Sequence, residues 1–132
     1  MKFNRDCKSF PGVYACEIMT SEEMKDCTDC KFYEPISKKI LIIKLGAMGD
    51  VLRTTPLLPA LKKKYGHDSH ITWLVKEESL QLLQKNPYID KILIYNPENI
   101  LKLKYEKFDV LINLDIEQAA TLTVNEVKAE EK

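Results

Sequence analysis

The sequence lacks several features that would identify common classes of protein. Its 20 basic and 20 acidic side chains balance, so no excess of positive charge is present to neutralise nucleic-acid phosphates. No apolar run approaches the roughly 18 residues that span a membrane. The first ten residues, MKFNRDCKSF, contain no apolar segment of a secretory signal. These absences argue against nucleic-acid partners and a membrane span, and they predict a cytoplasmic protein.

Two phosphate-binding motifs are also absent. The sequence contains neither the G-x-G-x-x-G fingerprint of dinucleotide-binding domains nor the G-x-x-x-x-G-K-[ST] loop of P-loop ATPases. Neither an NAD-dependent enzyme nor a P-loop ATPase is therefore supported. What is present is an ordinary globular composition: 132 residues, 45% hydrophobic and 30% charged, which suit one domain with a real hydrophobic core.

The chain divides into two regions of different texture. Residues 1–38 hold all four cysteines and show no sustained apolar period, whereas apolar runs alternate with amphipathic ones from Lys39 onward. Net charge also varies along the chain: it is −1 over residues 1–38, +5 over 39–76 and −4 over 77–132. A basic middle suits an anionic ligand. Lys62–Lys64, however, more simply end a helix, where cations interact favourably with the helix dipole.

Residues 39–132 are predicted to form an α/β domain. Four short runs of β-branched and apolar residues are typical of strands buried on both faces of a sheet. The segments between them have helical spacing. Strands that alternate with helices indicate a parallel sheet built of right-handed crossovers, which is a Rossmann-like fold. The expected strands are 39–44, 70–75, 91–95 and 108–114, and the expected helices are 51–65, 77–85, 98–106 and 116–132.

Two prolines complicate the first of these helices. Pro56 and Pro59 lie inside its apolar pattern, where proline loses a hydrogen bond and clashes with the preceding turn. One solution starts the regular helix at Pro56, with Thr55 as its N-cap. Another keeps a distorted turn over residues 50–54. The sequence leaves both solutions open.

The segment after the first strand is the candidate functional site. Residues 45–55, LGAMGDVLRTT, follow the strand at the position where open α/β sheets bind ligands. Gly46 and Gly49 would let a ligand approach the backbone closely. Asp50 has two interpretations: an N-cap that binds free helix amides, or a general base at the mouth of a cleft. By residue type alone, the cap is favoured.

The second region resembles the lipopolysaccharide heptosyltransferase family, the ADP-heptose-dependent glycosyltransferases. Its first part, KILIIKLGAMGDVLRTTPLLPALK, combines a hydrophobic strand, a turn ending in Gly-Asp and an apolar helix start that carries Thr-Pro, as in that family. Three further blocks follow in the family's order and spacing: the strand that ends at residues 73–75, the stretch 86–92 and the strand 108–115. The resemblance covers residues 39–132.

The resemblance implies the N-terminal half of a two-domain glycosyltransferase of the B type, with its active site between two Rossmann-like domains. The family's catalytic base is the aspartate after the glycine, which is Asp50 here. It takes a proton from an acceptor hydroxyl as that oxygen attacks the anomeric carbon of an ADP-sugar, with inversion. The family needs no metal for this step. The substrate-binding positions that the resemblance implies are Gly46, Met48, Gly49, Arg53, Thr54 and Thr55.

The resemblance also implies partners. These are an ADP-sugar donor and a lipopolysaccharide-type or other glycan or glycolipid acceptor, with at most peripheral contact at the inner membrane surface. Family members are more than twice as long as this chain, and their second domain carries most of the donor contacts. We therefore expect the chain to be a fragment or a truncated product that lacks the C-terminal donor-binding domain and has little activity alone.

The four cysteines suggest a second, structural site. Their pattern is C-x₈-C-x₁₀-C-x₂-C, and a C-x₂-C pair presents two thiolates to one metal. Residues 1–38 are too short for an adequate core and would need such a staple. We expect a structural zinc; a [4Fe–4S] cluster, two disulfides and free thiols are the alternatives. The candidate ligands are Cys7, Cys16, Cys27 and Cys30.

Two other functions compete with sugar transfer. One is a non-catalytic, flavodoxin-like domain that binds a small anion or a nucleotide. The other makes the cysteine-rich segment a metal-dependent interaction module. Among the remaining residues, His67 and His70 are expected at the surface and Trp73 in the core. Asp115, which follows the fourth strand, is expected to cap the next helix rather than to contact a substrate.

Overall fold

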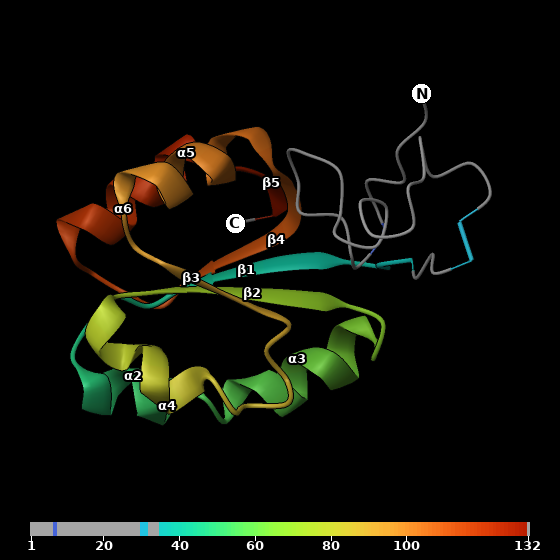
Figure 1. Cartoon of the computed structure of the whole chain (residues 1–132), viewed down its shortest axis with the longest axis horizontal. Helices are drawn as coiled ribbons and strands as arrows, with labels where there is room; N and C mark the ends of the chain where they lie inside the picture. Colours follow the sequence, from blue (N-terminus) through green and yellow to red (C-terminus); the bar gives the residue numbers. More distant parts are fainter. Residues whose placement is uncertain (1–6, 8–29, 32–34, 132) are drawn as a thin grey trace.

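The described chain folds as a parallel β-sheet with helices on both faces (Figure 1). The computed structural model describes Cys7, Cys30, Lys31 and residues 35–131. The elements in chain order are β1 (Lys39–Ile43), α2 (Met48–Thr54), α3 (Leu57–Tyr65), β2 (His70–Val75), the 3₁₀-helix η1 (Glu77–Ser79), α4 (Leu80–Leu83), β3 (Lys91–Ile94), α5 (Pro97–Tyr105), β4 (Lys107–Asn113), α6 (Gln118–Glu126) and β5 (Lys128–Glu131).

The strand order is β3-β2-β1-β4-β5, and each neighbouring pair is parallel. Helices α2, α3 and α4 cover one face, whereas α5 and α6 cover the other (Figure 1). The chain therefore winds outward from β1 to β3, returns to the far side of β1, and continues outward through β4 and β5. This is the Rossmann order, which confirms the predicted fold. A flavodoxin-like domain has the order 2-1-3-4-5, so that alternative is wrong in its topology.

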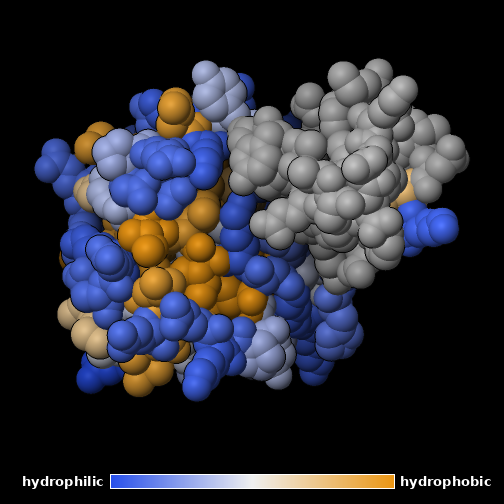
Figure 2. All heavy atoms as spheres, viewed as in Figure 1, coloured by the Kyte–Doolittle hydropathy of each residue, from blue (hydrophilic) through white to orange (hydrophobic). Residues whose placement is uncertain are grey.

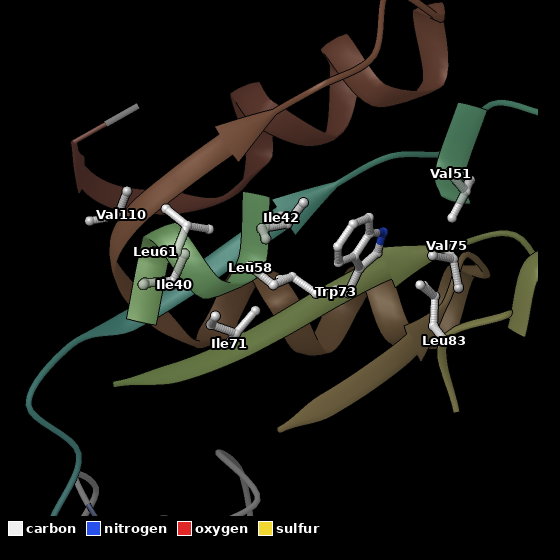
Figure 3. Packing of buried hydrophobic residues seen from close by; sticks show 10 residues of the cluster. All are labelled: Ile40, Ile42, Val51, Leu58, Leu61, Ile71, Trp73, Val75, Leu83 and Val110. Atoms are coloured by element: carbon white, nitrogen blue, oxygen red, sulfur yellow. The ribbon is translucent and has the colours of Figure 1, made fainter. Parts of the chain in front are cut away.

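Two hydrophobic clusters hold the helices onto the sheet. Successive side chains of a strand point to opposite faces, so Ile40 and Ile42 join the cluster under α2–α4, while Leu41 and Ile43 join the one under α5 and α6. All four are fully buried because β1 lies at the centre of the sheet. Trp73 lies in the first cluster (Figure 3), which confirms its predicted place in the core.

The two prolines are accommodated by a break between helices. Helix α2 ends at Thr54, and α3 begins at Leu57 with Pro56 as its N-cap. Pro59 is the third residue of α3, where a backbone N–H would have no partner inside the helix. Neither expected solution is correct in detail: residues 50–54 are regular helix, and the N-cap is Pro56 rather than Thr55.

The C-terminal part of the sequence prediction is also wrong. Helix α6 stops at Glu126, and the chain then forms a fifth strand instead of continuing as helix. Val127 is buried in an extended conformation, and Ala129 pairs with Phe108 of β4. Pairing with β4 thus overrides the weak strand propensity of Lys-Ala-Glu-Glu.

Two basic side chains, Lys62 and His70, are built into the structure. Lys62 lies in the last turn of α3, as predicted, whereas His70 was expected at the surface. Lys62 is buried; its Nζ donates to the carbonyl of Ser69 at 2.6 Å and to Asp90 Oδ2 at 2.9 Å. His70 is half-buried on β2, and burial, opposed by the charge of Asp90, lowers its pKa to about 4. His67 is exposed as predicted.

Apolar side chains form a patch on the face of the molecule that Figure 2 shows. Figure 2 shows hydrophobic side chains gathered between the two helical layers, on the side where β3 crosses the view in Figure 1. Over the residues that the structure describes, no helix is long and apolar enough to cross a membrane.

Candidate functional site at the carboxyl end of the sheet

The strand order reverses next to β1, and this reversal places the candidate site. In open α/β sheets, ligands bind in the crevice beyond the carboxyl ends of the strands where neighbouring connections diverge to opposite faces. Here those strands are β1 and β4, and the segments that follow them are residues 44–50 and 114–117. The turn singled out in the sequence therefore lies at the switch point of the fold.

Asp115 ties these two segments together. Its Oδ2 accepts a hydrogen bond from the backbone N–H of Leu45 at 2.7 Å, and its Oδ1 accepts one from the N–H of Glu117 at 3.1 Å. The carboxylate is buried. The N-cap of α6 is Glu117, so the expectation that Asp115 caps this helix is wrong. One carboxylate oxygen binds the amide of Glu117, the N-cap residue, and the other turns back toward β1.

The surroundings of Asp115 favour its ionised form. Burial by itself would raise the pKa of this carboxyl. The hydrogen bonds from the amides of Glu117 and Leu45, the charge of Lys44 and the amide of Gly46 act in the opposite direction and together hold the pKa below its ordinary value. At neutral pH, the site therefore contains a buried carboxylate that is stabilised mainly by backbone amides.

Two lysines complete the charges at this end of the sheet. Lys44, the residue after β1, has a side chain only 13% exposed, and its Nζ lies 3.9 Å from Asp115 Oδ2. Lys76, the residue after β2, donates to Glu117 Oε2 at 3.0 Å, and this hydrogen bond raises the pKa of Lys76. The segment after β4 thus supplies two carboxylates. Asp115 lies beside Lys44, which follows β1, and Glu117 binds Lys76, which follows the neighbouring strand β2.

The two glycines of the turn have different surroundings. A Cβ on Gly46 would lie 3.4 Å from Lys44 Nζ and 3.5 Å from Asp115 Oδ2, so the backbone there packs directly against this ion pair. A Cβ on Gly49 would meet nothing within 4 Å. Gly46 is therefore closely packed against the charged side chains of the site. Gly49 faces open space beside the exposed side chain of Met48.

Asp50 is exposed and does not cap its helix. It is the third residue of α2, whose N-cap is Ala47, and no side-chain hydrogen bond caps that end. The N-cap interpretation is therefore wrong. The Asp50 side chain is 57% exposed; its Oδ1 lies 4.0 Å from Nη1 of Arg53, which is 85% exposed. This contact leaves the Asp50 carboxylate accessible to a ligand.

The two threonines serve the far end of the same helix. The Thr54 hydroxyl donates to the carbonyl of Val51 at 2.6 Å, and the Thr55 hydroxyl donates to that of Leu52 at 2.8 Å. Both hydroxyls bond to carbonyls in the last turn of α2; the Leu52 carbonyl also accepts the backbone N–H of Thr55. Their predicted contact with a substrate stays a prediction, as do the substrate roles of Gly46, Met48, Gly49 and Arg53.

The predicted metal site lies largely outside the described residues. Cys16 and Cys27 are not described. Cys7 is buried and forms an isolated antiparallel bridge with Pro35, and Cys30 is partly exposed; neither of these two forms a disulfide. Among the residues that the structure does describe, no group of three or more His, Cys, Asp or Glu side chains could hold a metal. The four-cysteine site stays a prediction.

The fold and the switch-point site define an α/β domain of the Rossmann class, and comparison with known proteins takes the assignment further. No protein-family model matches the chain. A curated relative, lipopolysaccharide heptosyltransferase 1 from Campylobacter coli, is 39% identical over 54 residues, which are 41% of this chain and 16% of that protein.

Two solved structures have the same fold. The family 9 glycosyl transferase from Veillonella parvula has a TM-score of 0.59 and 29% identity, over 73% of this chain and 31% of the other. The E. coli heptosyltransferase WaaC with ADP also has a TM-score of 0.59, over 70% and 34% of the two chains; at 19% identity, it supports the fold alone. The chain thus spans about a third of these structures, and it resembles the heptosyltransferase family over part of its length, as predicted.

Proposed function

We propose that residues 39–131 form the acceptor-side half of a glycosyltransferase that moves a sugar from an ADP-sugar to a glycan or glycolipid acceptor. The relative from Campylobacter coli is named as a lipopolysaccharide heptosyltransferase, and the E. coli heptosyltransferase structure contains ADP. The name of the Campylobacter coli relative supports a heptose-like sugar. The ADP leaving group is what the resemblance to the ADP-heptose-dependent family implies. The match over only part of each relative supports a second domain beyond this chain.

One observation carries the proposal: the position of Asp50. Its carboxylate is exposed, caps no helix end and lies on the turn that follows the central strand at the switch point. A carboxylate with a purely structural role would be expected to bind backbone amides, as Asp115 does nearby. Asp50 is therefore the acidic side chain of this turn that is free to act on a ligand.

The proposed reaction is a single displacement. The acceptor hydroxyl oxygen forms a bond to the anomeric carbon of the sugar, while the bond from that carbon to the phosphate oxygen of ADP breaks. The hydroxyl proton goes to the Asp50 carboxylate, and ADP leaves with the electron pair. Attack from the side opposite the leaving group inverts the anomeric centre. A general base at this step contributes about 10²–10⁴ in rate, and it needs no metal.

The second domain would supply the donor contacts. Catalysis needs both reactants held in line and water excluded between them. Half a cleft does neither, so we expect the 132-residue chain alone to show little or no turnover of an ADP-sugar. Measurable transfer by the isolated chain would contradict this.

The test of Asp50 uses a two-domain protein, either natural or made by joining this chain to the second domain of a family 9 relative. Asp50→Asn keeps the size of the side chain but cannot take a proton, so we expect turnover of ADP-heptose with a lipopolysaccharide-core acceptor to fall about 10²–10⁴-fold. Because Asp50 caps no helix, the melting temperature should change little. ADP release and melting are measured on the same preparations.

A matched control is available on the other face of the sheet. Glu98 also lies in the first turn of a helix and pairs with a basic residue one turn later, Lys102. We expect Glu98→Gln to leave turnover unchanged. Near-normal turnover of Asp50→Asn, an equal loss in both variants, or an unsubstituted two-domain protein with no transfer would each overturn the proposal.

For the cysteine-rich segment, we propose one structural zinc bound by Cys7, Cys16, Cys27 and Cys30. Zinc binding would be folding energy for a segment with little core, so chelation should unfold residues 1–38 and leave the sheet intact. Protein purified without oxygen should contain one zinc per chain, and the strand amides should keep their NMR shifts when the metal is removed. Iron in place of zinc would indicate a cluster. Four freely titratable thiols without metal would contradict the site.

A further inference from the structure

We propose that Asp115 is the positioning residue of the site: its carboxylate fixes the turn that carries Asp50. This inference rests on the proposed role of Asp50 for its catalytic consequence, although the structural half of it can be tested separately. Residue type had predicted a helix cap for Asp115, and the contact that indicates a positioning role joins residues 70 positions apart.

The hydrogen bond from Leu45 occurs where the regular ladder ends. The last bonds around β1 at this end run from the N–H of Lys44 to the carbonyl of Leu74, and from the N–H of Leu114 to the carbonyl of Ile43. The next amide, that of Leu45, donates to a side chain, Asp115 Oδ2. The carboxylate thus extends the link between β1 and β4 by one residue beyond the sheet.

The turn is held between two fixed points. Leu45 is fully buried in the cluster under α5 and α6, and Val51 is fully buried in the cluster under α2–α4. Between them, exposure rises from the half-exposed Gly46 to the exposed Gly49 and Asp50. Asp115 therefore acts on the last anchored residue before the exposed part. If the Leu45 amide is released, the whole turn gains freedom.

The same strand pair contains a matched control at its other end. Asp109, a residue of β4 itself, accepts a hydrogen bond through Oδ2 from the backbone N–H of Lys39 at 2.8 Å. Lys39 and Asp109 are again 70 residues apart, and they lie at the amino end of β1. Asp109→Asn and Asp115→Asn therefore weaken equivalent bonds at opposite ends of the same pair. Only one of these bonds adjoins the turn.

The first experiment measures the turn by NMR in the complete 132-residue chain. Asn offers one acceptor oxygen, so Asp115→Asn cannot bind the amides of Leu45 and Glu117 together. We expect amide hydrogen exchange at Leu45 to become about 10- to 100-fold faster, because a hydrogen bond to a charged group is lost. The amide signals of Gly46 and Gly49 should also shift.

Asp109→Asn should speed exchange at Lys39 and leave the glycine signals of the turn in place. An Asp115→Asn turn with unchanged shifts and exchange would overturn the inference. If this variant does not fold, the unsubstituted chain provides the readout. When acid protonates Asp115, protection of the Leu45 amide, taken relative to the intrinsic exchange rate at each pH, should fall in step with the ¹³C shift of that carboxyl and before global unfolding. Protection at Leu45 that does not follow the Asp115 titration would also overturn the inference.

The second experiment tests the catalytic consequence in the two-domain protein. A misplaced base lowers the rate of the bound complex, so we expect kcat to fall on the order of 10²-fold in Asp115→Asn while KM for the donor changes much less. Asp109→Asn should keep its kcat. A loosened turn with normal kcat would mean that Asp50 does not act from this turn. If the turn keeps its amide shifts and exchange rates in Asp115→Asn, the positioning role is rejected, whatever the kcat of that variant.

Discussion

The two ends of the sheet use their charged side chains in different ways. At the amino end, the buried ammonium of Lys62 binds Asp90, and Asp109 binds the amide of Lys39. At the carboxyl end, Asp115 is used in the same way, but Asp50 and Arg53 stay exposed beside a glycine turn. Charged side chains that hold strands together are thus mostly buried against backbone amides or a counter-charge, whereas the charged side chains available to a ligand are exposed.

The largest expected effect at the amino end concerns pH. The pKa of His70 is about 4 in the folded chain and 6.5 in its ordinary state, so between these values the unfolded chain binds a proton that the folded chain does not. Stability should therefore be complete above about pH 6.5 and fall by up to about 3 kcal/mol as the pH drops toward 4. Urea unfolding across this range measures it.

The control for this prediction is the other histidine. His70→Gln should flatten the pH dependence between pH 6.5 and 4, and the exposed His67→Gln should retain it. If stability in the unsubstituted chain does not change over this pH range, then His70 is not buried as described and is instead exposed, like Asp50 and Arg53 at the carboxyl end. The contrast between the two ends would then be lost.

A somewhat smaller effect is expected from Lys62. Lys62→Met keeps the length of the side chain but removes the donor to Asp90 and to the Ser69 carbonyl, so unfolding free energy should fall by about 1–3 kcal/mol. Lys63→Met, at the exposed neighbouring position, should change it by less than about 0.5 kcal/mol. Equal effects, measured by denaturant unfolding, would mean that the contacts of Lys62 contribute no more to stability than an exposed lysine does.

The smallest effect belongs to the carboxyl end. Gly49 lies in helix α2 with open space around its Cα, so Gly49→Ala should fit and raise the unfolding free energy by up to about 0.5–1 kcal/mol. Its methyl group would nevertheless project toward a ligand on the turn, so transfer by the two-domain protein should fall. A variant that is more stable and equally active would remove Gly49 from the substrate site.

The sequence predicted the strands well because their signal is local. The run from Ile40 to Ile43 is apolar at every position, and this pattern is typical of a strand covered on both faces, whatever its neighbours. The Gly-Asp turn at residues 49–50 was found because it follows such a strand. Asp50 itself was misjudged as a cap by residue type alone, since its helix starts three residues earlier than a cap at Asp50 requires.

The features missed by sequence analysis depend on register between distant segments. The contacts of Asp115 with Leu45, and of Lys62 with Asp90, exist only once β1 lies beside β4 and α3 packs on the sheet. No local pattern contains that information. β5 was missed for the same reason: its residues form a strand through pairing with β4, although their own propensity does not favour it. A sequence signal for a residue such as Asp115 is an acidic side chain that follows a strand, where that strand is expected to pair with the one before the glycine turn.

The composition of β5 has a consequence for behaviour in concentrated solution. Within the described chain, β5 borders the sheet on one side and β3 on the other. A bordering strand can recruit a strand from another molecule, and charged side chains discourage this. Lys128, Glu130 and Glu131 give β5 three charges in four residues, whereas β3 carries Ile92, Leu93 and Ile94 behind a single lysine. Self-association of this domain should therefore begin at β3, and a lysine introduced there should suppress it.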